Sequence, residues 1–339
     1  MNTQMLNPNE IQKAAEIIKN GGLVGIPTET VYGLGADGLN PGAVSHIFLA
    51  KGRPQDNPLI LHISEASWLG QYCQDIPEVA WQLAKRFWPG PLTMILRRKP
   101  IVPDVVTAGL ETVGMRCPAH SMCRAIIEAA EVPIAAPSGN TSGRPSPTTA
   151  RHMLDDMEGK IDAILDGGSC QVGVESTILD LTCDPPRLLR PGGVPLEELR
   201  DVLGDVALDP AITRQMEAGE KPRAPGMKYR HYAPKAPVTV VKGMPVRSAE
   251  YILEHLTDSG WEGVICFNEF AHWYSGYLVE RLGGVVDTWE QARRLFRALR
   301  AMDEAGVKHI WAQCPDESGM GLAVVNRLSK AAGFHIVEV

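Results

Sequence analysis

The chain has 339 residues, which is long for a single hydrophobic core, so two domains are expected. Its apolar content of 44% and charged content of 22% are ordinary for a globular protein, and no run approaches eighteen apolar residues, which excludes a membrane-spanning helix. The formal net charge of −7 argues against a whole-surface affinity for nucleic acid, although a local basic patch remains compatible with it.

The cysteines and the N-terminus bear on the compartment. The seven cysteines are scattered and form no C-x-x-C pair, a pattern typical of reduced thiols rather than of a disulfide framework or a zinc cluster. The first ten residues are polar and lack the layout of a signal peptide. We therefore expect a cytoplasmic protein that does not bind membranes.

Helix and strand patterns alternate along residues 1–205, which we take as the first domain. Asn7, Pro8 and Glu10 predict a helix start, and Gly21 and Gly22 predict its end. Further helices are expected at about 41–50, 77–88, 122–130 and 196–203, and strands at 23–26, 59–63, 92–96, 112–116, 133–136, 163–166, 176–181 and 187–189. This interleaving predicts a twisted mixed α/β sheet with helical cover, and the last strands, which lack helices between them, are expected to be antiparallel.

The character of the chain changes after the first domain. Residues 206–237 are rich in proline and glycine and predict a long ordered linker, yet residues 227–232 concentrate basic and aromatic groups, which is unusual for a passive linker. Residues 238–339 predict a smaller, Rossmann-like α/β domain. Its strands are expected at 238–241, 263–267 and 309–312, and its helices at about 248–256, 289–305 and 322–332.

Gly33–Gly38 satisfies the G-x-G-x-x-G pattern literally. A dinucleotide fingerprint needs its first glycine directly after a strand and its last glycine at the start of a helix. Here residues 27–32 intervene, and a helix restarts only at Pro41. We therefore interpret the segment as a glycine-rich turn beside a site. Because no Walker A sequence is present either, a triphosphate must be held by other means.

Polar clusters follow the strands, where open α/β sheets place their ligands. Residues 27–34 carry hydroxyls and a carboxylate, which fit either a polar ligand or a capped turn. In residues 51–59, Lys51 and Arg53 can bind phosphate oxygens or can simply complement a helix dipole. The strand that follows carries His62.

Two further clusters lie later in the first domain. Arg116 ends an apolar strand, where an unpaired cation is costly, so a carboxylate ligand or a structural aspartate is expected beside it. Residues 138–143, Ser-Gly-Asn-Thr-Ser-Gly, resemble an anion-binding nest or an ordinary Gly/Ser loop. Residues 173–178 and Arg190 add hydroxyls and one more cation, and their alternative reading is a strand edge with a turn.

These cations outnumber what a neutral substrate needs and suit a multiply charged anion together with a carboxylate. No H-E-x-x-H motif, histidine pair at metal-ligand spacing or G-x-S-x-G elbow is present, so no metal site is expected and acyl-enzyme chemistry is disfavoured. A site built for positioning and charge stabilisation fits phosphoryl or nucleotidyl transfer.

Several motifs carry a family resemblance. They are Pro-Thr-Glu-Thr-Val-Tyr-Gly-Leu (27–34), Lys-Gly-Arg-Pro (51–54), Asn-Pro-Leu (57–59), Arg-Phe-Trp-Pro-Gly-Pro-Leu-Thr (86–93), Ala-Pro-Ser-Gly-Asn-Thr-Ser-Gly (136–143), Glu-Ser-Thr-Ile (175–178) and Ala-Pro-Gly-Met-Lys-Tyr-Arg-His-Tyr-Ala-Pro (224–234). In this order they closely resemble the YrdC-like family, in its longer, two-domain form of L-threonylcarbamoyladenylate synthases. Ala224 stands where the linker motif often has serine.

The resemblance implies a nucleotidyltransferase that makes L-threonylcarbamoyladenylate from L-threonine, bicarbonate and ATP and releases pyrophosphate. In the family this is the first step of threonylcarbamoyladenosine formation at position 37 of tRNAs that read ANN codons. The implied partners are downstream tRNA threonylcarbamoyl-transfer proteins, and weak RNA binding is a further expectation.

The resemblance also implies roles for individual residues. The L-threonine site would consist of Thr30, His62, Arg116, Ala136 and Ser176. The ATP site would consist of Lys51, Arg53, Asn57, Thr112, Ser138, Asn140, Ser146 and Arg190, with Tyr232 reaching back from the linker as part of a lid. Lys51 and Arg53 would act as catalytic residues by neutralising the phosphates, together with Mg²⁺ brought by ATP.

Two rival functions are open at this stage. One is an RNA-binding or translation-associated module on the same fold, which would release no pyrophosphate. The other is the carbamoyltransferase of hydrogenase maturation, which shares the first domain but also needs an acylphosphatase domain and cysteine-rich zinc fingers, and the sequence shows neither.

Overall fold

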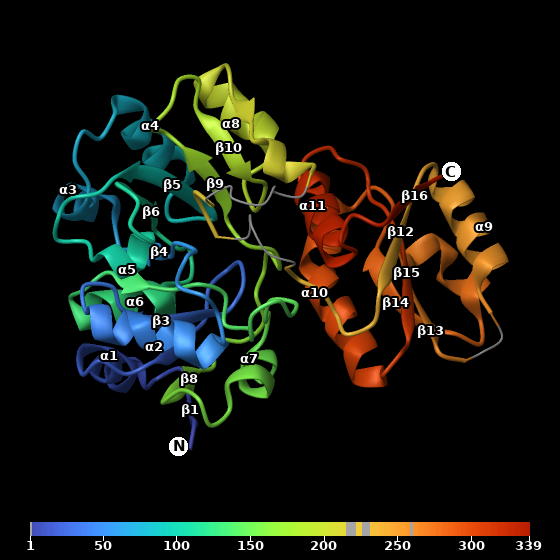
Figure 1. The fold of residues 1–339 in the computed structure, drawn as a ribbon, viewed down its shortest axis with the longest axis horizontal. Helices are drawn as coiled ribbons and strands as arrows, with labels where there is room; N and C mark the ends of the chain where they lie inside the picture. Colours follow the sequence, from blue (N-terminus) through green and yellow to red (C-terminus); the bar gives the residue numbers. More distant parts are fainter. Residues whose placement is uncertain (1, 215–221, 226–230, 258–259) are drawn as a thin grey trace. The chain divides into compact units, whose positions relative to one another are not determined.

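The computed structural model describes residues 2–214, 222–225, 231–257 and 260–339, and the chain divides into two compact units (Figure 1). The first unit comprises Met1–Ser142, Ser146–Gln171 and Glu175–Lys228. The second comprises Tyr229–Val339 together with two short segments of earlier sequence, Gly143–Pro145 and Val172–Val174.

The first unit is built on a mixed sheet in which eleven strands are described. In order across the sheet they are β1 (Gln4–Leu6), β8 (Ala163–Leu165), β2 (Val24–Ile26), β3 (Gly33–Asp37), β7 (Ile134–Ala135), β4 (Ile60–His62), β6 (Thr112–Arg116), β5 (Leu92–Arg97), β9 (Thr177–Asp180), β10 (Arg187–Arg190) and β11 (Ala207–Leu208). The antiparallel prediction for the late strands is right for β9 with β10, but β8 runs parallel to β1 and β2. A helix that the sequence did not reveal, α7 (Ala150–Met157), precedes β8 and reverses the chain.

The glycine-rich segment is a strand, so its interpretation as a turn is wrong. Gly33–Asp37 forms the buried strand β3, which pairs antiparallel with β2 and places Ile26 opposite Gly33. A Cβ atom on Gly35 would lie 2.9 Å from Cγ2 of Ile134, closer than packed carbons tolerate. These glycines therefore allow close packing within the sheet. No helix follows until Pro41, in agreement with the rejection of a dinucleotide fingerprint.

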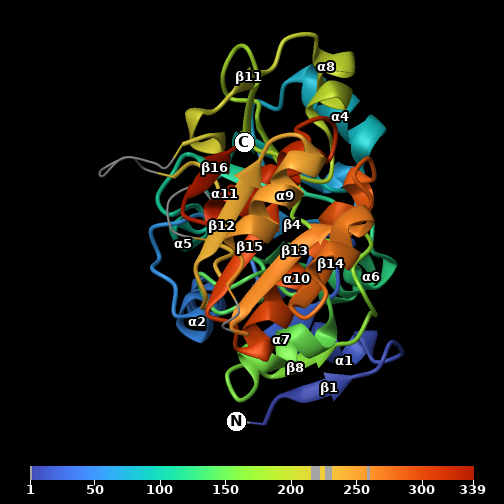
Figure 2. The ribbon, with the colours of Figure 1, turned by 90° about the vertical axis from the view of Figure 1, so that its right-hand side faces the viewer.

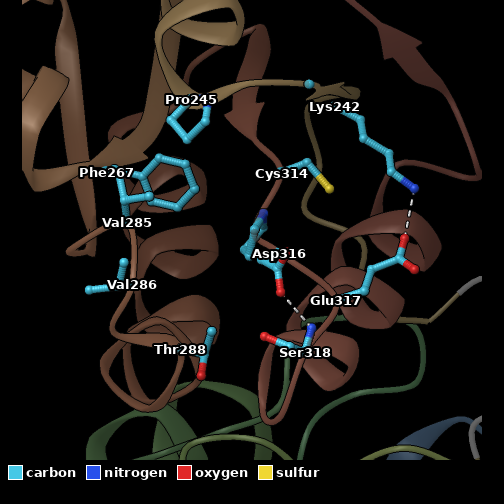
Figure 3. Close-up of a pocket in the computed structure, with 12 residues that line it drawn as sticks. Lys242, Pro245, Phe267, Val285, Val286, Thr288, Cys314, Asp316, Glu317 and Ser318 are labelled. Atoms are coloured by element: carbon cyan, nitrogen blue, oxygen red, sulfur yellow. Dashed lines mark hydrogen bonds and ion pairs between the residues drawn. The ribbon is translucent and has the colours of Figure 1, made fainter.

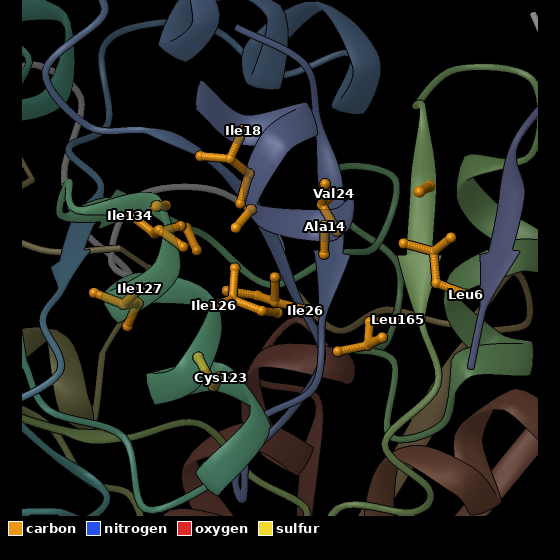
Figure 4. Packing of buried hydrophobic residues seen from close by; sticks show 14 residues of the cluster. Leu6, Ala14, Ile18, Val24, Ile26, Cys123, Ile126, Ile127, Ile134 and Leu165 are labelled. Carbon is orange, nitrogen blue, oxygen red and sulfur yellow. The ribbon is translucent and has the colours of Figure 1, made fainter. Parts of the chain in front are cut away.

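Helices cover this sheet. They are α1 (Ile11–Lys19), α2 (Pro41–Lys51), α3 (Leu69–Tyr72), α4 (Glu78–Phe87), α5 (Asp104–Thr107), α6 (Ser121–Ala130), α7 and α8 (Leu196–Leu203), with short 3-10 turns at η1 (Ala66–Trp68) and η2 (Pro210–Ile212). Figure 4 shows how Ile18 of α1 and Ile126 and Ile127 of α6 pack with Val24 and Ile26 of β2. All five side chains are fully buried, and each contributes about 1.5–3 kcal/mol of burial free energy.

Part of the predicted linker folds onto the first unit. Ala224 is fully buried and belongs to one apolar cluster with Ile178 of β9 and Leu189 of β10. The side chain of Arg223 lies 3.1 Å from the carboxylate of Asp180. Of the linker 206–237, predicted to act as a lid over the active site, residues 215–221 and 226–230 lie outside the described residues.

The second unit contains a parallel sheet of five described strands. In order they are β14 (Leu278–Gly283), β13 (Glu262–Phe267), β15 (His309–Gln313), β12 (Val238–Lys242) and β16 (Ile336–Glu338). The predicted strands are confirmed as β12, β13 and β15. Numbered within the unit, the strand order is 3-2-4-1-5, which differs from the 3-2-1-4-5 run of dinucleotide-binding domains.

Helices cover both faces of this second sheet. They are α9 (Pro245–His255), α10 (Thr288–Ala305) and α11 (Gly321–Ala331), with a 3-10 turn at η3 (Asn268–Tyr274). Figures 1 and 2 place α10 and α11 on one face and α9 on the other. Because the strands are parallel, all of their carboxyl ends lie at the same edge. All seven cysteines of the chain are free thiols, and no helix in the described part of the chain is long and apolar enough to cross a membrane.

Candidate active site

Lys51 and Arg53 are positioned by the end of α2. Asn40 caps the start of this helix by accepting the backbone amides of Gly42 (3.0 Å) and Ala43 (3.1 Å). Gly52 ends it with a left-handed backbone (φ 61°), and the amide of Arg53 returns to the carbonyl of Phe48 at 2.9 Å. The turn leaves Lys51 on the buried side of the helix and directs the chain away from it at Arg53.

Lys51 is 2% exposed and organises the Ser-Gly-Asn-Thr-Ser-Gly loop. Its ammonium donates to the backbone carbonyls of Ser138 and Asn140, and its own carbonyl accepts the amide of Ser142 at 3.0 Å. Burial, and then the charge of Arg53, lower the pKa of Lys51 well below its usual value. The structure thus places Lys51 as a support of the loop, while its contact with phosphate stays a prediction.

The loop that Lys51 supports is internally hydrogen-bonded. The Ser138 hydroxyl donates to Oδ1 of Asn140 at 2.6 Å, and Nδ2 of Asn140 donates to the Thr141 carbonyl at 2.8 Å. Further along, the fully buried Ser146 donates to Oε1 of Glu175 at 2.6 Å. The predicted ATP residues Ser138, Asn140 and Ser146 therefore lie on a preorganised segment.

The first polar cluster forms a buried turn after β2. The Thr28 hydroxyl accepts the amides of Thr30 and Val31, each at 3.2 Å, and donates to the Val31 carbonyl at 2.6 Å. The hydroxyls of Thr28 and Thr30 lie 2.8 Å apart. The capped-turn alternative is therefore present in the structure, and it fixes Thr30, which is fully buried, next to Glu29.

Arg116 is paired with a carboxylate of the chain itself. Its Nη2 lies 2.7 Å from Oε1 of Glu29, with side-chain exposures of 5% and 7%, and its Nε donates to the Gly90 carbonyl at 3.4 Å. Burial raises the pKa of Glu29, but the charge of Arg116 and hydrogen bonds from Arg116 and from backbone amides together outweigh this effect, and the pKa ends below its usual value. The expected structural partner is thus Glu29 rather than an aspartate. Sequence reasoning noted this carboxylate but gave it no role.

His62 lies beside Arg116 because β4 and β6 are parallel neighbours in which these two residues are paired. Burial, and then the charge of Arg116, lower the pKa of His62 to about 3, so the ring is neutral at physiological pH. Its Nδ1 is buried and has no hydrogen-bond partner among the described residues. Ala136 is held nearby, since its amide donates to the Ile60 carbonyl at 3.0 Å.

Ser176 and Arg190 form a second buried group at the start of β9 and the end of β10. The hydroxyls of Ser176 and Thr93 lie 2.8 Å apart. Arg190 donates from Nη2 (2.9 Å) and Nε (3.2 Å) to the Ser176 carbonyl, and from Nη1 to the Pro225 carbonyl at 3.2 Å. These acceptors orient the guanidinium.

Asn57 and Thr112 lie at the other end of β4 and β6. Ile60 pairs with Gly114, so Asn57, three residues earlier, lies on the Thr112 side. Thr112 is separated from Arg116 by four residues of strand, about 13 Å. Asn57 is fully buried, and neither polar atom of its amide group has a partner in the described part of the chain. Nη2 of Arg53 approaches the Asn57 carbonyl at 3.5 Å.

The structure therefore groups most of the predicted residues in the first unit. His62 and Arg116 are paired at the ends of β4 and β6, Thr30 is adjacent to the Glu29 that contacts Arg116, and Ala136 lies opposite Ile60 of β4. Tyr232 belongs to the second unit, where its ring packs 5.3 Å from that of Phe296 and lies 5.2 Å below the guanidinium of Arg327. Its contribution to an ATP site stays a prediction.

Comparisons with known proteins identify the family of this chain. The family model described as Telomere recombination matches residues 16–192, and the model described as Threonylcarbamoyl-AMP synthase, C-terminal domain, matches residues 194–333. The chain belongs to the threonylcarbamoyl-AMP synthase family. Relatives named threonylcarbamoyl-AMP synthase include one from Pyrococcus abyssi, which is 50% identical over 97% of this chain and 96% of its own length. Another, from Bacillus subtilis, is 46% identical over 98% of this chain and 95% of its own length.

A solved structure of the family covers both units. The crystal structure described as P. abyssi Sua5 complexed with L-threonine matches with a TM-score of 0.94 and 48% identity, covering 99% of this chain and 100% of that one. The family's fold, a YrdC-like first domain and an α/β C-terminal domain, is therefore the fold of this chain.

Proposed function

We propose that this chain forms L-threonylcarbamoyladenylate from L-threonine, bicarbonate and ATP and releases pyrophosphate, acting in the cytoplasm as a nucleotidyltransferase. The observation that carries the proposal is the match over nearly the whole chain to relatives named threonylcarbamoyl-AMP synthase and to a family structure described with L-threonine. In this role the enzyme performs the first step of threonylcarbamoyladenosine formation at position 37 of tRNAs that read ANN codons.

The chemistry needs two bond-forming steps. The amine of threonine takes up CO₂ from bicarbonate and becomes a carbamate. A carbamate oxygen then attacks the α-phosphorus of ATP, the bond to the β-phosphate breaks, and pyrophosphate leaves with the electron pair. An ionised carbamate is already nucleophilic, so the reaction needs orientation and charge stabilisation more than a general base.

The threonine subsite proposed here uses Arg116 for the substrate carboxylate. Nη2 of Arg116 is engaged by Glu29 and Nε by Gly90, so Nη1 is the nitrogen that can take a carboxylate oxygen without breaking these contacts. Thr30 and Ser176 supply hydroxyls for a short polar ligand, and His62 supplies a neutral ring.

The ATP subsite uses Lys51, Arg53, Asn57, Thr112, Ser138, Asn140, Ser146 and Arg190. This donor set contains cations, hydroxyls and amides, which suit phosphate and nucleotide groups. Mg²⁺ prefers carboxylates, phosphate oxygens and water, so the ion fits here as one carried mainly by the phosphates of ATP. When bound, it would neutralise charge that develops on the leaving pyrophosphate.

The product is a reactive acyl-adenylate. We therefore propose that tRNA threonylcarbamoyl-transfer proteins take it up directly, and weak RNA binding by the chain stays a prediction. The test is a pyrophosphate-release assay in which L-threonine, bicarbonate and ATP are omitted in turn. Release that needs all three supports the proposal, whereas release independent of threonine, or no release at all, overturns it.

A further inference from the structure

The second unit contains a cavity of about 660 Å³ at the carboxyl edge of its parallel sheet (Figure 3). Its walls come from the segments after β12, β13, β14 and β15, represented by Lys242, Phe267, Val285 and Cys314. Open parallel sheets bind ligands at this edge, and the volume lies within the range of small-molecule sites. None of the residues placed in the proposed active site lines it.

The cavity has one apolar wall and one polar wall. Figure 3 shows Pro245, Phe267 and Val285 on one side. Asp316 lies across from them and Thr288 below them, and one carboxylate oxygen of Asp316 accepts the Ser318 amide at 2.7 Å. The Ser318 side chain also hydrogen-bonds to this carboxylate, and Thr288 adds a hydroxyl to the lining. A flat apolar ring with hydroxyl groups at one end would satisfy both walls.

The charges of the lining disfavour phosphate. Lys242 is the cation of the cavity, and Glu317 already holds its ammonium at 2.7 Å. Asp316 adds a further negative charge. The lining residues therefore carry one positive and two negative charges, and an incoming phosphate would meet net repulsion.

The starts of the helices near the cavity offer few free amides to an anion at the positions that the structure shows. Helix α9 starts with Pro245, which has no N–H to offer. At α10, the Asp287 side chain accepts the Glu290 amide at 2.9 Å. Before α11, Asp316 occupies the Ser318 amide. At α10 and in the turn before α11, the chain's own carboxylates thus take backbone amides that a phosphate would otherwise use.

We infer that this cavity binds an uncharged nucleoside. The base lies on the Phe267 and Val285 wall, and the ribose hydroxyls donate to Asp316, the type of contact that acidic side chains make with ribose in α/β domains. Val286, which is 92% exposed at the rim, covers the open side of the base. The site is separate from the proposed synthase reaction and does not depend on it.

The test uses the full chain, labelled with ¹³C at valine methyl groups and titrated with adenosine. The substitutions Val285→Ala and Val286→Ala assign the methyl resonances of these two valines, which serve as reporters. Adenosine is expected to shift resonances of both valines saturably. Asp316→Asn, which keeps the side-chain shape, should raise the dissociation constant about tenfold through loss of a charged acceptor. The matched control is Glu254→Gln, in the last turn of α9, which should leave it unchanged.

AMP and ATP serve as the charged comparisons. AMP is expected to bind the reporter site at least about tenfold more weakly than adenosine, because its phosphate meets Asp316 and Glu317. Equal or tighter binding of AMP at these resonances overturns the inference, as does the absence of a saturable adenosine shift in the millimolar range. Pyrophosphate release tests the synthase proposal separately, so either idea can fail alone.

Discussion

The buried pair of Glu29 and Arg116 gives a quantitative prediction about stability. At 2.7 Å and an effective dielectric constant of about 20, the two charges attract by about 6 kcal/mol before desolvation of both groups offsets most of it. Removing one partner leaves the other charge buried and uncompensated. Arg116→Met is therefore expected to lower the free energy of unfolding by about 3–5 kcal/mol.

Removing both charges should recover most of that loss. In Glu29→Gln/Arg116→Met neither charge of this pair remains, and the free energy of unfolding is expected to return to within about 1–2 kcal/mol of the wild type. The matched control is the pair Lys19 and Glu131, which has the same 2.7 Å separation but side-chain exposures of 42% and 77%. Its double-mutant cycle should give less than about 1 kcal/mol. Urea unfolding followed by circular dichroism measures all of these variants.

Activity separates the structural role of Arg116 from its proposed ligand role. The double variant should stay folded, yet kcat/KM for threonine in pyrophosphate release should fall about 10- to 150-fold through loss of a charge-assisted hydrogen bond worth about 1.5–3 kcal/mol. Two results would refute this reasoning. One is a coupling energy as small as that of the exposed pair, and the other is wild-type threonine dependence in the double variant.

The same pair has a pH signature. The lowered pKa of Glu29 means that the pair stabilises the fold above the ordinary carboxyl value of 4.5 and that this contribution is lost as pH falls through the lowered folded value. In Arg116→Met, burial without a partner raises the Glu29 pKa, so the stability penalty is greatest at neutral pH and shrinks on acidification. A penalty that grows towards low pH contradicts this assignment.

Other residues of the site give sharper single tests. Lys51→Met leaves two buried carbonyls without their donor, so we expect a loss of about 1–3 kcal/mol in urea unfolding and a KM increase for ATP that exceeds the one for threonine. Asn57→Leu removes an amide that has no protein partner among the described residues, so stability should change by less than about 1 kcal/mol while the KM for ATP rises about tenfold. Because the pKa of His62 is about 3, kcat/KM for threonine should show no His62 ionisation between about pH 5.5 and 7.5. A step near pH 6.5 that disappears in His62→Gln would contradict that assignment.

The central strands were predictable because each is a short apolar run bounded by turn residues. The predicted strand 112–116 coincides with β6, and 59–63 contains β4. The strands that the sequence did not reveal lie mostly at sheet edges, such as β1 and β14. Only one of the three residues of β1 and two of the six residues of β14 are buried, so these strands carry little apolar signal. Strand β3 is central but was missed because glycine has weak strand preference, and its need for close packing exists only in three dimensions.

The site was likewise only partly predictable from the sequence. Motif reading selected Arg116 and His62, and the sheet register brings them together. It could not assign the partner of Arg116, because Glu29 is distant in sequence and meets it only through the fold. It also could not show that the Lys51 ammonium donates to two backbone carbonyls, because a helix C-terminus beside a Gly/Ser loop gives no local sign of that contact.

The partners of the buried cations bear on how the site distinguishes L-threonine from ATP. Lys51 is held by the neutral carbonyls of Ser138 and Asn140 rather than by a carboxylate, which suits a position next to the phosphates of ATP. Arg116 is neutralised by Glu29, so its subsite offers directed hydrogen bonds with little net charge. A triphosphate would gain far less there than a single carboxylate held in the right geometry. Under the proposed function, Glu29 therefore favours threonine at Arg116 partly by making that position unattractive to ATP.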